Sequence, residues 1–500
     1  MTAQDDGPEA TAEERTETSG RGLGGIAARS AVVTMTGQLA KIIIQLVSVI
    51  ILARLLTPYD YGLLAMVMAV VGVADVFRDF GLSSAAVQAK QLSRAQRDNL
   101  FWVNTLTGLI LLVVIIAAGP LLALFYRQPE LTMISAVVGF SFLFSGLATQ
   151  YRADLQRRLL FTRLTVADVG SPLVALGVAI GLALGGAGYW ALVGQQVVQF
   201  LANLIMVVIA AGWLPRWWRR DAPVRPFLAF GGNLAGGQLI HYLGANFDAL
   251  LIGARFGANP LGLYNRGFQL LMRPLGQLRA PLTSVALPVL SRLTDDERRY
   301  GEYLRIGQRA MGYTLVLGLG LVIGAVDPVV AIFLGDQWTG VAPIMRWLAL
   351  CGIFETLAFV GYWTYVSKGL VRKLLHFTIM STALKIIGIS IGSLWGVEGV
   401  AAGFALAEVA SWPLSFAWLR RSSGLDVVPL IINGLRIVAV SLAIAAATWL
   451  VSQQLAGAGD WARLGAAVGV AVVVAAASLA VPSVRRDVAS VVRSARLGFR

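Results

Sequence analysis

Two apolar stretches of the sequence carry polar side chains, cations among them, along one helical face. In the stretch 260–288 these residues are spaced i, i+3, i+7 and i+11: Arg266, Gln269, Arg273 and Gln277. In the stretch 30–54 they are spaced i, i+4, i+7 and i+11: Thr34, Gln38, Lys41 and Gln45. Both spacings place all four side chains on one side of an α-helix. Cations inside an apolar segment are typical of a membrane transporter.

The depth of these cations favours a water-filled interior. If each stretch crosses a bilayer as a helix, Lys41 lies about 17 Å from one end and Arg273 about 20 Å from the other. Both then lie near the middle of a hydrocarbon core of about 30 Å, where charged groups normally face a cavity. Structural carboxylates could instead neutralise them, but the stretch 260–288 holds three arginines, Arg279 included, and no acid.

The stretch 226–252 combines five glycines with polar side chains. Glycine permits close helix packing or bending, so this stretch is either a tightly packed helix or a flexible gate. Its polar residues are Asn233, Gln238, His241, Asn246 and Asp248. His241 is either a hydrogen-bonded interior histidine or a proton carrier.

Further ionisable groups lie in the middle of later apolar stretches, namely Glu355, Lys385 and Glu408. They could pair with one another, or one acid could carry a coupling proton, because unpaired charges are costly in hydrocarbon. The candidates for ion coupling are therefore Asp248, Glu355 and Glu408.

The elements that position these residues are long apolar runs. The chain is 57% hydrophobic and 14% charged, whereas soluble domains are about 45–50% apolar and about 25% charged. The sequence predicts an all-α polytopic membrane protein with about fourteen spans. These are 30–54, 60–84, 101–125, 131–151, 164–184, 188–212, 226–252, 260–288, 308–326, 342–366, 371–394, 397–419, 430–452 and 462–481. The region 327–341 could partly re-enter the membrane.

Basic residues are concentrated in alternate loops between these spans, which predicts that both termini are cytosolic. The same alternation explains the net charge of +14 without a nucleic-acid partner. Residues 1–25 are polar and acidic, which predicts a disordered cytosolic tail. The segment 482–500 is a basic cytosolic tail, and its amphipathic pattern predicts that it lies on anionic lipid.

The chain repeats itself across about 200 residues. The segment 51–56 (ILARLL), followed by Gly62 and Leu63, reappears as 252–257 (IGARFG), followed by Gly262 and Leu263. The pattern of the first six spans thus returns in spans seven to twelve, which predicts two pseudo-symmetric six-helix lobes around a central cavity. We place these lobes at 26–213 and 226–421, with a basic linker at 214–225 and two additional helices at 430–481.

Sequence motifs for catalysis are absent. The sequence has no G-x-x-x-x-G-K-[ST] phosphate loop, no H-E-x-x-H motif and no cysteine–histidine cluster. Cys351 is the only cysteine, so no disulfide can form within the chain. We therefore expect a protein that is not an enzyme and needs no cofactor or metal ion.

Four segments together resemble a known family. They are 53–62 (ARLLTPYDYG), 80–82 (FGL), 155–158 (LQRR) and 286–291 (ALPVLS). In combination they resemble the polysaccharide-transporter (Wzx-type) flippases of the multidrug/oligosaccharidyl-lipid/polysaccharide exporter superfamily. The resemblance covers residues 25–425. It implies two lobes that form a V, and movement of a polyprenyl-pyrophosphate-linked oligosaccharide from the inner to the outer leaflet of a bacterial cytoplasmic membrane. Polysaccharide polymerase, other envelope-assembly proteins and membrane lipids are the implied partners.

On this reading the cations Lys41, Arg266 and Arg273 bind the pyrophosphate. Sugar hydroxyls would bind the amides, which are Gln38, Gln45, Asn233, Gln238 and Asn246. Alternating access by rocking of the lobes is the expected mechanism. Three alternatives stay open: a cation-coupled drug antiporter of the same superfamily, a peptidoglycan-precursor lipid flippase, and a membrane glycosyltransferase. A cationic cavity argues against the first, and short outer loops argue against the third.

Overall fold

The computed structural model describes residues 12–78, 93–219, 242 and 244–498. Every regular element in these residues is helical, as the long apolar runs of the sequence predict. Eleven helices in this part of the chain are long and apolar enough to cross a membrane. The predicted all-α membrane class is therefore confirmed. The α10 helix (Ala258–Arg292) is not among the eleven, because its arginines and prolines lower its hydropathy.

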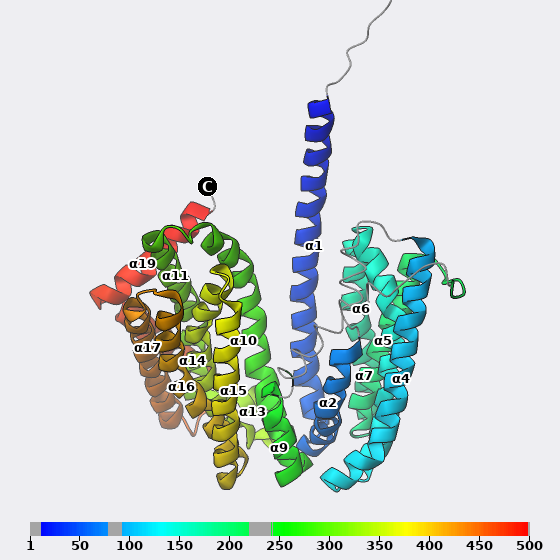
Figure 1. The fold of residues 1–500 in the computed structure, drawn as a ribbon. Helices are drawn as coiled ribbons and strands as arrows, with labels where there is room; N and C mark the ends of the chain where they lie inside the picture. Colours follow the sequence, from blue (N-terminus) through cyan, green and yellow to red (C-terminus); the bar gives the residue numbers. More distant parts are fainter. Residues whose placement is uncertain (1–11, 79–92, 220–241, 243, 499–500) are drawn as a thin grey trace, which may run out of the picture.

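The described helices up to residue 211 form one body, the N-lobe (Figure 1). Its six helices are α1 (Ala12–Leu55), α2 (Pro58–Arg78), α4 (Arg94–Tyr126), α5 (Glu130–Arg157), α6 (Phe161–Leu184) and α7 (Trp190–Ala211). Ser93 begins α4 with a capping box: its side chain accepts the Gln96 N–H, and the Gln96 side chain accepts the Ser93 N–H. The closest packing within this lobe is between α4 and α5 and between α6 and α7.

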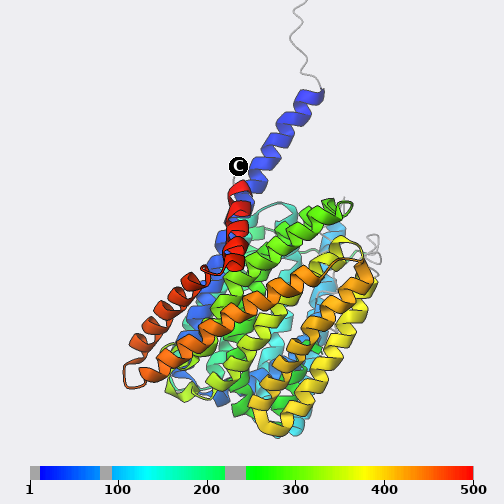
Figure 2. The same cartoon turned by 90° about the vertical axis from the view of Figure 1, so that its left-hand side faces the viewer.

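The helices between residues 247 and 423 form a second body, the C-lobe (Figure 1). They are α9 (Phe247–Phe256), α10, α11 (Glu297–Met311), α12 (Leu317–Gly324), α13 (Val326–Phe333), α14 (Val341–Ser367), α15 (Val371–Gly392) and α16 (Gly396–Ser423). A π-helical turn at Gly312–Val316 joins α11 to α12, so the predicted span 308–326 is a continuous but irregular helix. Two further helices, α17 (Val428–Gln454) and α18 (Asp460–Ser478), cover the flank of this lobe (Figures 1 and 2). The lobe boundaries drawn from the sequence stay predictions.

The two lobes touch where the sequence repeat is clearest. A Cβ atom on Gly62 of α2 would lie 1.8 Å from the carbonyl oxygen of Ala258, at the start of α10. A Cβ atom on Gly262 of α10 would lie 1.8 Å from the carbonyl oxygen of Pro58, at the start of α2. Because the repeat pairs Gly62 with Gly262, the two contacts are reciprocal, as a two-fold relation between the lobes requires. Only glycine permits backbones to approach this closely.

The lobes are close together at one end of the molecule and diverge toward the other (Figure 1). We call the end where α1 finishes and α10 begins the closed end, and the end where α19 lies the terminal end. The long helix α1 runs between the lobes, and both views show its first turns projecting beyond the terminal end (Figures 1 and 2).

The region 327–341, which the sequence left as a re-entrant candidate, bridges the lobes at the closed end. It contains all of the eight-residue helix α13 except Val326, and a short 3₁₀ turn at Asp336–Trp338. The Trp338 indole N–H donates to the Ala53 carbonyl at 2.7 Å, and the Gln337 amide donates to the same oxygen at 2.7 Å. The segment therefore fastens the C-lobe to the last turn of α1.

The C-terminal helix α19 (Pro482–Gly498) packs against α11. Its Asp487 is buried and forms ion pairs with Arg309 of α11, at 3.0 Å, and with Arg436 of α17. Arg485 and Arg486 are on the exposed side of the same helix. One face of this amphipathic helix therefore packs against α11 and α17, and the opposite face is exposed.

Candidate functional site

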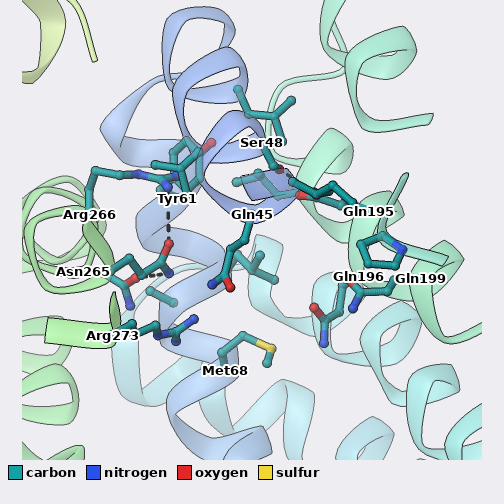
Figure 3. Close-up of a pocket in the computed structure, with 18 of the residues that line it drawn as sticks. Gln45, Ser48, Tyr61, Met68, Gln195, Gln196, Gln199, Asn265, Arg266 and Arg273 are labelled. Atoms are coloured by element: carbon teal, nitrogen blue, oxygen red, sulfur yellow. Dashed lines mark hydrogen bonds between the residues drawn. The ribbon is translucent and has the colours of Figure 1, made fainter. Parts of the chain in front are cut away.

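A cavity of about 390 Å³ lies between the lobes, lined by α1, α2, α6, α7 and α10. It brings together four of the residues chosen from helical phase and depth: Lys41, Gln45, Arg266 and Arg273. Gln45 from the N-lobe and Arg273 from the C-lobe extend toward each other in Figure 3. Two faces from different parts of the chain therefore meet in one site.

The cavity is cationic. Among the described residues, its lining contains the cations Lys41, Arg266 and Arg273 and no acidic residue. Lys41 and Arg273 are both exposed, and neither makes a hydrogen bond or ion pair with another residue in the described part of the chain. Cations that no carboxylate neutralises are suited to a ligand with several negative charges.

Arg266 is held differently, at the closed end of the cavity. Its side chain is only 2% exposed, and its guanidinium carbon lies 3.6 Å from the ring centre of Tyr61, on the opposite lobe. Trp338 lies on another side, at 5.5 Å. One N–H donates to Gln269 Oε1 at 3.2 Å, while Nε and Nη2 have no acceptor among the described residues. Aromatic faces stabilise a cation without satisfying its hydrogen bonds, so these two buried donor atoms stay unpaired in this state.

Glutamines of α7 form the wall opposite α10 (Figure 3), a feature that the sequence reasoning missed. Gln195 donates from its amide to Ser48 Oγ at 2.8 Å, which ties α7 to α1. Gln196 and Gln199 also line the cavity. The signal was present in the sequence, because Gln195, Gln199 and Asn203 are spaced i, i+4 and i+8 on one helical face.

Several amides assigned to sugar binding lie elsewhere. Gln38 is exposed and lines neither this cavity nor a second one in the N-lobe. The Asn246 amide donates to the Tyr242 carbonyl of its own chain segment at 2.9 Å, just before α9 begins. Asn233 and Gln238, together with His241, lie outside the described residues.

The acids considered for ion coupling have protein partners. Asp248 is buried and accepts a hydrogen bond from the Tyr264 hydroxyl at 2.6 Å. Glu408 pairs with Lys385 at 3.3 Å, one of the pairings that the sequence suggested. Glu355 pairs instead with Arg279 of α10, at 3.0 Å. The third arginine of α10 is thus neutralised by a carboxylate from α14, whereas Arg266 and Arg273 are not.

The sequence profile of one protein family matches residues 51–343, which is more than half of the chain. That family is described as "Polysaccharide biosynthesis protein". The chain belongs to this family. The match spans the site helices α2, α6, α7 and α10, so it includes Arg266 and Arg273 and begins shortly after Lys41.

Curated relatives of the chain have names from the same field. The lipopolysaccharide biosynthesis protein WzxC of Escherichia coli (strain K12) is 25% identical over 74% of this chain and 76% of the relative. The teichuronic acid biosynthesis protein TuaB of Bacillus subtilis (strain 168) is 27% identical over 75% of this chain and 79% of the relative.

Solved structures of transporters share the fold. The lipid II flippase MurJ, in an inward closed conformation, matches 90% of this chain and 99% of its own, with a TM-score of 0.68 and 14% identity. An inward-facing multidrug resistance transporter of the MATE family matches 77% of this chain and 94% of its own, with a TM-score of 0.59 and 15% identity. At these identities the likeness concerns the fold alone, and it supports the predicted transporter architecture.

Proposed function

We propose that this family member is a flippase that carries a polyprenyl-pyrophosphate-linked oligosaccharide across the membrane. The observation that carries the proposal is the cavity between the lobes, whose described lining residues include three cations and no acid. Pyrophosphate is rich in anionic acceptors, and two or more charge-assisted hydrogen bonds of about 1.5–3 kcal/mol each would hold it. The family and the names of the relatives point to polysaccharide precursors.

Translocation follows from the shape of the cavity. Sugar hydroxyls and phosphates cannot enter hydrocarbon without losing their hydrogen bonds, which costs several kcal/mol per group. A polar cavity supplies those partners while the prenyl tail stays in lipid. Rocking of the lobes would close the terminal end and open the closed end, which gives alternating access. Binding and release need no covalent step, so the protein acts as a transporter and not as an enzyme.

The proposal places the protein in the bacterial cytoplasmic membrane, with both termini in the cytosol. The positive charge of alternate loops supports this orientation. The terminal end, toward which the lobes diverge, would then face the cytosol, where the lipid-linked precursor is made. Membrane lipids surround the lobes, and polysaccharide polymerase and other envelope-assembly proteins would act on the delivered cargo.

Two related functions fit less of the structure. A peptidoglycan-precursor flippase would need the same pyrophosphate site, and the MurJ likeness concerns only the fold. A drug antiporter that takes organic cations would need acids in its cavity, and none of the residues that the structure describes in this lining is acidic.

Native mass spectrometry of the protein purified from its own membrane tests the proposal. The wild type should retain a polyprenyl-pyrophosphate glycan, and Arg273→Ala should lose it, because this mutation removes a cation that no described residue neutralises. Arg298→Ala, which alters an arginine with an 89% exposed side chain on α11, is the matched control and should retain the lipid. Retention of only bulk phospholipid by the wild type would contradict the proposal.

A further inference from the structure

A second cavity, of about 450 Å³, lies within the N-lobe. It is lined by α1, α2, α5, α6 and α7, and its volume is in the range of small-molecule sites. Lys41 and Gln199 line both this cavity and the cationic one. The two cavities are therefore adjoining compartments, and a ligand held by Lys41 can extend into either.

An ion pair is built into the wall of the second cavity. Arg152 of α5 donates two hydrogen bonds to the Asp168 carboxylate of α6, at 2.7 and 3.2 Å, and a third to Asn203 Oδ1 of α7 at 3.2 Å. The Arg152 and Asp168 side chains are 32% and 36% exposed, and all three residues line the cavity. Three helices thus present one fixed array of donors and acceptors to its interior.

A second ion pair of the N-lobe is buried away from both cavities and serves as a structural comparison. Asp154, two residues from Arg152 on α5, pairs with Arg97 at 3.4 Å. Its side chain is only 10% exposed, and Asp154 lines neither cavity. Both acids pair with an arginine, but only Asp168 keeps much of its carboxylate accessible from a cavity.

Charge separates the two compartments. In the second cavity Asp168 neutralises Arg152, and Asp75 neutralises Arg78 at 2.9 Å. Lys41, at the junction with the first cavity, is the cation of this lining that no described residue neutralises. The first cavity suits a polyanion, and the second suits a neutral ligand that is rich in hydrogen-bonding groups.

A carboxylate beside a guanidinium offers acceptors and donors side by side, which matches neighbouring hydroxyls on a sugar ring. We propose that the N-lobe cavity is a glycan subsite, in which the Arg152–Asp168 pair and Asn203 bind a neutral sugar of the cargo. This inference rests on the proposed function, because it assumes that the pyrophosphate occupies the adjoining cationic cavity. It assigns the sugar to residues other than the amides that the sequence suggested.

Two lipid probes separate the subsite from the phosphate site. The dissociation constants of purified protein in detergent are measured for a polyprenyl pyrophosphate and for the same lipid carrying a neutral disaccharide. In the wild type the disaccharide should strengthen binding. Asp168→Asn should reduce that sugar-dependent gain about tenfold, or about 1.4 kcal/mol, and should not weaken the affinity for the sugar-free lipid, because it removes no cation. Asn203→Ala keeps the Arg152–Asp168 ion pair and should also reduce the sugar-dependent gain.

The control is Asp154→Asn on α5, the helix that carries Arg152. It breaks the structural pair with Arg97 and should leave the gain intact. Equal loss in Asp154→Asn and Asp168→Asn would show a purely structural role and overturn the inference. A wild type without any sugar-dependent gain would overturn it as well. So would a wild type that binds the lipid with an acidic disaccharide more tightly than the lipid with the neutral one. If the sugar-free lipid fails to bind and Arg273→Ala changes nothing, the proposed function itself is wrong.

Discussion

Substituting Gly262 by alanine should shift the protein away from the closed-end contact between the lobes. The new Cβ atom would lie 1.8 Å from the Pro58 carbonyl oxygen, whereas real Cβ contacts stay beyond 3.0 Å. The backbones of α2 and α10 must therefore separate by more than about 1 Å, because the atom that the Cβ meets belongs to the main chain and no side chain can rotate away.

The size of the shift follows from the cost of overpacking, about 1–3 kcal/mol. In the alternating-access scheme the contact between Gly62 and Gly262 forms only when the closed end is shut, so this cost falls on one state. A cost of about 2 kcal/mol changes the ratio of the two states by about 30-fold. The fraction of molecules in which the terminal end is closed should therefore rise.

Electron–electron distance measurements between spin labels across the terminal end check this expectation. The labels are placed by Arg94→Cys at the start of α4 and Arg292→Cys at the end of α10, both exposed, in a Cys351→Ser background. Gly262→Ala should add a shorter distance between the labels.

The matched control is Gly276→Ala on the same helix, because a Cβ atom there would meet nothing within 4 Å. It should keep the wild-type distance distribution. If Gly262→Ala is folded and also keeps that distribution, the reasoning about the glycine contact is refuted.

Two further substitutions probe contacts between helices. Tyr61→Leu should lower the free energy of unfolding by about 1–2 kcal/mol, since it removes the aromatic face 3.6 Å from the Arg266 guanidinium. Tyr61→Phe keeps that face and should retain most of the stability. Equal loss of stability in both variants in a chemical-denaturation assay would contradict the cation–π role. Asp487→Asn should release α19 by weakening its ion pairs with Arg309 and Arg436, at a cost of about 3–5 kcal/mol. Limited trypsin digestion should then cut within α19 at least tenfold faster, and an unchanged rate would show that other contacts hold the helix.

Much of the fold was predictable because its signals are local. Apolar run length determines where a helix can cross a membrane, and the internal repeat is enough to pair Gly62 with Gly262. The irregular parts were harder to predict. The bridge formed by Gln337 and Trp338 depends on contacts with Ala53, far away in the chain, and such tertiary contacts leave no periodic signal.

Charge made part of the candidate site visible in the sequence: the chosen cations line one cavity, and their role in binding stays a prediction. Lys41, Arg266 and Arg273 stand out because a cation in an apolar helix is costly, so its position carries information. A glutamine in an apolar helix costs less free energy than a cation, so the spacing of Gln195 and Gln199 is a weaker signal of a site. Helical phase alone also misplaced Gln38, since it gives the face of a helix and not which part of that face another lobe covers.

The contact between Arg266 and Tyr61 sets a minimum binding energy that a cargo must supply before the closed end can open. In the closed state one of its faces is occupied by the Tyr61 ring of the opposite lobe. A cargo that draws the guanidinium away must offer more than the cation–π contact supplies, about 2 kcal/mol when desolvated. A pyrophosphate with charge-assisted hydrogen bonds exceeds that value, whereas an uncharged lipid does not. Under the proposed function, in which this arginine binds the cargo, it would then prevent unloaded cycling, and uncharged lipids would leave by the side from which they entered.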